Sequence, residues 1–105
     1  MKGRVIAVFN LEKNAYIVKL TSHASKRMCQ RGVSQNDCLN IISRLRVSAV
    51  REYGSEGEDE VAIIDEETGL TLIVAFDCNE IRIITVIDKT TYVRIRDNTL
   101  VEKIA

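Results

Sequence analysis

Three short apolar runs in the second half of the chain most constrain what it can fold into. They span residues 61–65, 70–77 and 80–88 and are rich in β-branched side chains. Residues 66–69 (Glu-Glu-Thr-Gly) and 78–79 (Cys-Asn) separate them, and both sequences are typical of turns. Short apolar runs joined by tight turns are typical of neighbouring strands. The pattern therefore predicts an antiparallel meander, with one face of the middle strand formed by Leu70, Leu72, Val74 and Phe76.

Four other segments are predicted as extended. Arg4 to Phe9 and Ala15 to Leu20 are rich in Val, Ile, Tyr and Phe, and the polar residues 10–14 lie between them. This arrangement predicts an N-terminal β-hairpin. Val50 to Tyr53 and Thr91 to Arg96 are interpreted as two shorter strands.

The residues between the hairpin and the meander carry helical signals. Thr21 and Ser22 offer N-cap oxygens for a helix over residues 23–31, and Gly32 follows at the expected end. Ser34 and Asp37 have the spacing of a capping box. The next apolar residues recur at helical spacing: Cys38, Ile41, Ile42 and Leu45. A second helix is therefore predicted from about Gln35 to Arg46.

These elements predict one α+β domain over residues 1–105, with residues 1–20 as an N-terminal β-hairpin extension. The expected architecture has two short helices packed on one face of a twisted antiparallel sheet of four to six strands. A length of 105 residues excludes a two-domain enzyme. A chain that is 46% hydrophobic can form a core, which excludes a disordered tail.

The sequence lacks the patterns that mark membrane spans, signal peptides and zinc sites. No uncharged stretch approaches the roughly 20 apolar residues of a membrane span, and no signal-peptide cleavage pattern follows the basic start. We therefore expect a cytoplasmic protein with no membrane partner. Cys29, Cys38 and Cys78 are widely spaced and form no zinc motif, so they are interpreted as small buried apolar residues. No metal or cofactor is expected.

Charge is divided unevenly along the chain although the formal net charge is zero. Residues 1–53 contain ten Lys or Arg and three Asp or Glu, whereas residues 54–105 contain five and twelve. Seven of those acids lie between Glu56 and Glu67. Such asymmetry suits a protein that meets an anionic partner with one surface. Neutralisation of the two halves within the fold, or between the subunits of a homodimer, explains it equally well.

The first predicted helix carries the clearest candidate site. His23, Arg27 and Arg31 recur every four residues, so on a helix they project within an arc of about 80°. Guanidinium groups bind phosphate oxygens in a planar fashion, and imidazole transfers protons near neutral pH. Lys26 stands beside them as a further candidate phosphate ligand. The alternative is an ordinary solvated helix face with a capping histidine.

Residues 20–34, LTSHASKRMCQRGVS, contain a more specific pattern. The stretch resembles the H-A-x-x-R-M-x-x-R-G signature of a bacterial and phage domain family of unknown function, DUF4258-like, which is similar to the RelE/ParE-type toxins. The resemblance implies a RelE-like fold and a small metal-independent endoribonuclease from a phage or mobile element. It implies His23 as the acid or base and Arg27 and Arg31 as phosphate-binding cations. An antitoxin or another protein partner is implied as well.

The residue inventory limits this mechanism. Metal-independent RNA cleavage needs a base, an acid and positive charge on the transition state. The chain has one histidine, so the second proton-transfer group would be Tyr53, Tyr92, Lys26 or a carboxylate, or would be absent. Tyr92, Arg94 and Arg96 are candidate RNA-binding residues, or an ordinary strand edge. The alternative function is a non-catalytic interaction protein of the same fold that binds a host protein or a nucleic acid.

Overall fold

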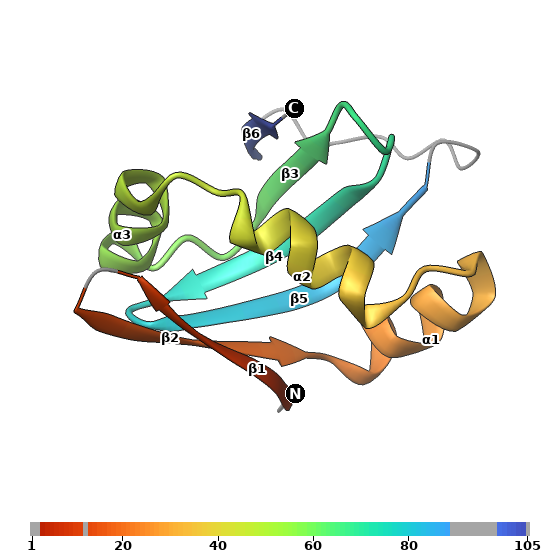
Figure 1. Cartoon of the computed structure of the whole chain (residues 1–105), viewed down its shortest axis with the longest axis horizontal. Coiled ribbons are helices and arrows are strands. Elements are labelled where there is room, and N and C mark those ends of the chain that lie inside the picture. Colours follow the sequence, from red (N-terminus) through yellow and green to blue (C-terminus); the bar gives the residue numbers. More distant parts are fainter. Residues whose placement is uncertain (1–2, 12, 89–98, 105) are drawn as a thin grey trace.

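A six-stranded sheet forms the centre of the molecule (Figure 1). The computed structural model describes residues 3–11, 13–88 and 99–104. The strands lie in the order β1-β2-β5-β4-β3-β6. Their bounds are β1 (Arg4–Leu11), β2 (Asn14–Leu20), β3 (Val61–Asp65), β4 (Thr71–Asp77), β5 (Glu80–Ile87) and β6 (Leu100–Ile104). The predicted N-terminal hairpin and the β3-β4-β5 meander are both present.

Three helices connect β2 to β3: α1 (Ser22–Arg31), α2 (Gln35–Ser43) and α3 (Val47–Glu56). The Thr21 hydroxyl caps α1 by accepting a hydrogen bond from the Ala24 amide at 3.0 Å. The helix ends at Gly32, whose φ of 66° is the left-handed conformation that glycine adopts readily. Ser34 and Asp37 form the predicted capping box at the start of α2.

The third helix corrects the sequence analysis. Residues 50–53, predicted as a strand, lie inside α3, and the segment predicted as a single helix to Arg46 already ends at Ser43. The four residues from Val50 are too few to reveal a helical period. The structure shows that Ala49, Val50 and Gly54 are the buried residues of α3, so packing on the sheet decides the conformation.

The sheet is mixed, whereas the sequence analysis predicted an antiparallel one. β2 and β5 are parallel, as are β3 and β6, and the other neighbours are antiparallel. The reason is the route of the chain. The helices carry it from β2 across the sheet to β3, and the meander then returns toward β2 and places β5 beside it in the same direction.

The core lies between the three helices and one face of the sheet. β4 occupies an interior position, and Leu72, Val74 and Phe76 of its predicted buried face are at most 2% exposed. The predicted apolar stripe of α2 is also buried. On the opposite face of the sheet several side chains are half-buried, including Ile17, Lys19, Ile73, Ala75 and Arg82.

Several other expectations have a definite outcome. Cys38 is buried as expected, but Cys29 and Cys78 are exposed, because they lie on the solvent side of α1 and in the β4–β5 turn. Strand β6 was not predicted. The predicted strand Thr91 to Arg96 lies outside the described residues. Within the described part of the chain, no helix is long and apolar enough to cross a membrane.

Candidate functional site

Helix α1 carries the candidate site and packs against β5. Ala24 and Met28 enter the core, with exposed fractions of 0% and 5%. The Thr21 hydroxyl donates to the Ile84 carbonyl at 3.1 Å, which ties the start of the helix to β5. Because the two buried residues fix the rotation of α1, the side that carries His23 and Lys26 faces solvent.

Two of the three predicted catalytic residues share this outer side. His23 is exposed and makes no hydrogen bond or ion pair with any residue that the structure describes. Arg27 is half-buried, and its Nη1 donates to Oε1 of Gln30 at 2.9 Å. Lys26 and Gln30 are exposed beside them. The structure therefore brings His23, Lys26 and Arg27 onto one cationic helix surface.

Arg31 diverges from this surface. Its Nη1 donates to the carbonyl of Val86 on β5. It lines a different hollow, together with Asp37 and Asp88. The helix rotates by about 80° between residue 23 and residue 31, which is enough to turn Arg31 toward the sheet. The predicted three-residue constellation is therefore not assembled, since Arg31 is held by a backbone carbonyl and lies near carboxylates.

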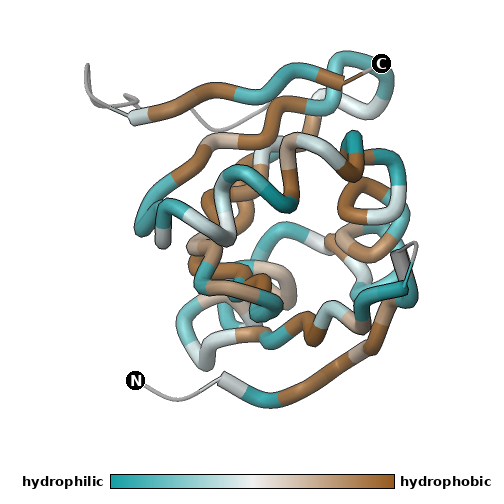
Figure 2. The backbone as a smooth tube through the Cα atoms, turned by 90° about the vertical axis from the view of Figure 1, so that its left-hand side faces the viewer, coloured by the Kyte–Doolittle hydropathy of each residue, from teal (hydrophilic) through white to brown (hydrophobic). Residues whose placement is uncertain are grey.

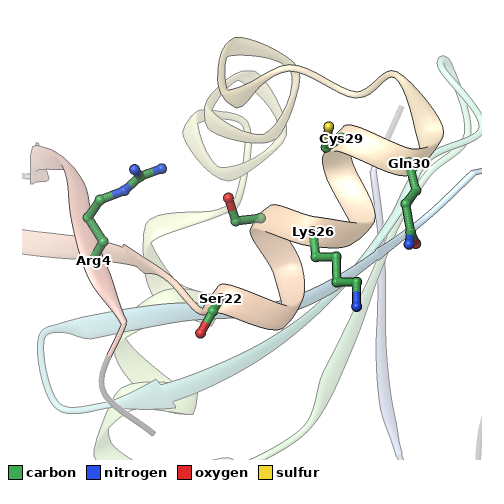
Figure 3. A pocket seen from close by; sticks show the side chains of 6 residues that line it. Arg4, Ser22, Lys26, Cys29 and Gln30 are labelled. Carbon is green, nitrogen blue, oxygen red and sulfur yellow. The ribbon is translucent and has the colours of Figure 1, made fainter.

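A second basic feature lies between α1 and the start of β1. An open hollow of about 570 Å³ is lined by six described residues, Arg4, Ser22, Ser25, Lys26, Cys29 and Gln30. Figure 3 shows Arg4 on β1, across from the α1 side chains. The lining thus supplies two cations, two hydroxyls, an amide and a thiol, and none of these described residues is acidic. Such a donor-rich set suits an anionic ligand.

Four basic residues elsewhere in the fold have acidic partners. Arg44 binds Asp65 through the two terminal nitrogens of its guanidinium group, at 3.2 and 2.6 Å. Arg46 binds Glu102 at 3.2 Å. Lys19 contacts Glu80 at 2.8 Å, and Arg82 binds the same carboxylate. The charges of the two halves therefore compensate one another at several positions, as one of the two interpretations expected.

The α1 side of the molecule carries cations without such acidic partners. Arg4 and Lys26 are both exposed, and neither has an ion-pair or hydrogen-bond partner among the residues that the structure describes. The chain from residue 13 to residue 36 contains five Lys or Arg and no Asp or Glu. The α1 hollow therefore brings together two exposed cations that have no acidic partner, whereas Lys13 and Lys103, which are also exposed and unpaired, lie elsewhere among the described residues.

The structure gives different outcomes for the residues considered as a second proton-transfer group. The hydroxyl of Tyr53 donates to Oε1 of Glu102 at 2.7 Å. Burial, followed by this bond, raises the pKa of Tyr53 to about 12, which makes it a poor acid near neutral pH. Tyr92, Arg94 and Arg96 lie outside the described residues. Among the described residues, no group of three His, Cys, Asp or Glu side chains could hold a metal ion.

Sequence reasoning missed the partner of α1 in this site. Arg4 was assigned to a strand and given no functional role, because nothing in the spacing of residues 4 and 26 indicates that they meet. Ser22, Ser25 and Cys29 share the outer side of α1 at intervals of three and four residues. That periodicity was available in the sequence and could have indicated them.

Comparisons with protein-family models, with curated proteins and with solved structures found no match to this chain.

Proposed function

We propose that the protein is an RNA-binding domain of RelE-like fold that engages RNA phosphates through the outer side of α1 and the adjacent hollow. One observation carries the proposal. Arg4 and Lys26 line a solvent-open hollow that has no acidic residue among its described lining, while Arg44, Arg46 and Lys19 elsewhere are neutralised. Cations that are exposed and not paired are those that can exchange counterions for phosphates.

The neighbouring side chains fit the same partner. His23 and Arg27 extend the cationic surface beyond the hollow, and the Gln30 amide and serine hydroxyls can donate to phosphate or ribose oxygens. The H-A-x-x-R-M-x-x-R-G pattern on α1 and the order of helices before a meander support a RelE-like fold. The identity of the anion as RNA rests on that resemblance.

Binding without cleavage is the form of this function that the geometry favours. Arg31 is turned to the Val86 carbonyl, and Tyr53 is bound to Glu102. His23 therefore stands on the surface without one of its two expected cations and without that proton-transfer partner. Binding without catalysis requires only exposed positive charge, which Arg4 and Lys26 supply at the α1 hollow.

The first test measures RNA affinity against salt concentration. Fluorescence anisotropy with a labelled single-stranded RNA compares the wild type with an Arg4→Ala, Lys26→Ala double variant. We expect the double variant to bind at least tenfold more weakly, with a salt slope smaller by about 1.4, since each lost phosphate contact contributes roughly 0.7. Lys103→Ala is the matched control, because Lys103 is an exposed lysine on β6.

Unchanged affinity and slope in the double variant, or an equal loss in Lys103→Ala, would show that the α1 hollow is not the binding site. Substitution of two exposed residues should leave the fold intact, which circular dichroism checks.

Ribonuclease activity is the second candidate, favoured by the exposed His23 one helical turn from Arg27. The test incubates RNA with the protein in EDTA and examines the product ends. Cleavage that leaves 2′,3′-cyclic phosphates and disappears in His23→Ala, while RNA binding persists, would establish the catalytic form. The proposal of binding alone expects intact RNA with both proteins.

A further inference from the structure

The exposed apolar side chains of the molecule are concentrated on the two edges of the sheet. Four large apolar residues of the described part of the chain are exposed: Val5 at 53%, Val8 at 55%, Leu100 at 41% and Val101 at 45%. The first two lie on β1 and the last two on β6, the outermost strands. An edge strand also presents unpaired backbone donors and acceptors, so an apolar edge is a template for another strand.

The two edges differ in how well they are protected against such pairing. β6 has five residues, of which Glu102 and Lys103 are charged. β1 has eight residues, and Arg4, at its end, is its one charged residue. Shortness and charge are the usual means by which natural sheets prevent edge-to-edge association. β1 is longer and carries a charge only at its end, and Figure 2 shows the segment that follows the N-terminus as largely hydrophobic.

An irregularity in β1 makes this edge complementary to itself. The register with β2 shifts at Ile6, so that Val5 is opposite Lys19 and Val8 is opposite Ile17. Lys19 and Ile17 are two residues apart on β2 and share a face, so Val5 and Val8 also share a face. In an antiparallel pair of two β1 strands, Val5 of each copy can therefore lie opposite Val8 of the other.

The same register also gives the other side chains of β1 favourable neighbours. Arg4 of one copy lies opposite Phe9 of the other, both on the helix side, and the two Arg4 side chains lie at opposite ends of the seam. No like charges face each other, and a guanidinium next to an aromatic ring is a favourable contact. Ala7 lies opposite Ala7 of the other copy at the symmetry axis, and Ile6 is the extra residue of the irregularity. Every side chain between the two arginines is therefore apolar.

We propose that the occupant of the β1 edge is a second copy of this chain, and that the protein is a twofold dimer with one continuous sheet through an antiparallel β1–β1 pair. The symmetry axis is perpendicular to the sheet, because residues opposite each other in an antiparallel pair share a face. The helices of both copies therefore lie on the same side, with an α1 hollow near each end of the seam. This inference does not depend on RNA binding.

The test determines molar mass by light scattering across a wide range of protein concentration. The wild type should approach twice the mass of the chain as the concentration rises. Val8→Lys should remain a monomer, because pairing of the two β1 strands would then bury one lysine of each copy in the apolar seam. Val101→Lys is the matched control: this valine is exposed to a similar degree on the other edge, and the variant should dimerise as the wild type does.

A crosslinking experiment tests the register. With Cys29 and Cys78 replaced by serine, a Val5→Cys variant is mixed with a Val8→Cys variant under oxidising conditions. We expect a disulfide-linked dimer from the mixture and little from either variant alone, since only residues that are directly opposite approach closely enough. A wild type that stays monomeric at every concentration would overturn the proposal. Loss of the dimer in Val101→Lys but not in Val8→Lys would do the same.

Discussion

Asp65 is the most deeply buried charged side chain that the structure describes, with no exposed surface. Arg44 binds both of its carboxylate oxygens, and the Thr68 hydroxyl donates to Oδ2 at 2.6 Å. The backbone amide of Glu67 donates to Oδ1 at 3.1 Å. A buried carboxylate with this many donors is costly to leave without its partner. The Arg44–Asp65 pair therefore joins the end of α2 to the end of β3.

This pair predicts a loss of stability in acid. The hydrogen bonds from Arg44, opposed by burial and assisted by Thr68, lower the pKa of Asp65 from 3.8 to about 2. The unfolded chain therefore binds the proton more readily than the folded one. The stabilisation is complete above pH 3.8 and is lost as pH falls toward 2. Urea titrations of the wild type and Asp65→Asn across this interval should show the decline in the wild type and a weaker dependence in the variant.

At neutral pH, Asp65→Ala should lower the free energy of unfolding by on the order of 3 kcal/mol, because Arg44 loses its main partner. Glu67→Ala is the comparison, since Glu67 contacts the same guanidinium at 3.6 Å but is largely exposed. Exposed pairs contribute about 1 kcal/mol or less. Equal effects of the two substitutions would contradict the central role of Asp65.

Gly54 shows how a single residue sets the contact between α3 and the sheet. Its carbonyl accepts a hydrogen bond from the Cys78 amide at 2.8 Å, and a Cβ added to Gly54 would overlap with the Cys78 carbonyl oxygen. The helix can approach the β4–β5 turn this closely only because glycine has no side chain.

Gly54→Ala should therefore destabilise the protein by roughly 1–3 kcal/mol, the usual range for an overpacked site, despite the higher helix propensity of alanine. Ser55→Ala, the next residue along α3 and an exposed one, should have little effect. Thermal unfolding followed by circular dichroism measures both. A stabilised Gly54→Ala variant would mean that the contact between α3 and the turn is not as close as described.

Among the elements, α1 and α2 could be predicted from the sequence, whereas α3 and β6 could not. The first two have local signals: Thr21 and Gly32 bound α1, and Ser34 with Asp37 starts α2. α3 has no side-chain cap at Arg46, and its buried residues are defined by contacts with β4. β6 contains Glu102 and Lys103 in five residues, so its pattern does not resemble that of a buried strand.

Glu102 explains how such a strand is held. It is 8% exposed and accepts hydrogen bonds from Tyr53 and Arg46 of the α3 region. The Glu66 amide donates to the Ile104 carbonyl at 2.9 Å at the far end of the strand. The side-chain network therefore anchors β6 in the middle, and the backbone ladder with β3 holds it along its length.

We accordingly expect Glu102→Ala to loosen β6 without unfolding the domain. Hydrogen exchange measured by mass spectrometry should be faster in peptides that cover residues 100–104, while α1 and β5 keep the protection of the wild type. Uniformly faster exchange would instead show that Glu102 stabilises the whole fold and does not act locally on β6.

In the whole molecule, the uneven charge of the sequence resolves into ion pairs between residues distant in the sequence and a group of cations on the α1 side that have no acidic partner. Charge counts indicated that the two halves differ, but the pairings of Arg44 with Asp65 and Arg46 with Glu102 join residues 21 and 56 positions apart. Sequence distance gives no information on such contacts. The divergence of Arg31 from His23 could not be predicted from the sequence for the same reason, because it depends on the position of β5 in the fold.

The site was therefore predictable in part. The spacing of His23 and Arg27 on one helix followed from a local period, as did the proximity of Lys26. The meeting of Lys26 with Arg4 and the withdrawal of Arg31 depend on the order of strands, which the sequence analysis did not determine. The mixed sheet places the start of β1 near α1 and the end of β5 under Arg31.

The most direct test of the account is an NMR titration of the isotopically labelled protein with a short single-stranded RNA. We predict that the largest amide shifts fall on residues 22–30 and on Arg4, that they diminish as salt is added, and that residues of β3 and β6 are unaffected. Shifts concentrated on the β3–β6 side, or none at RNA concentrations that saturate other RNA-binding domains, would contradict the assignment of RNA binding to α1.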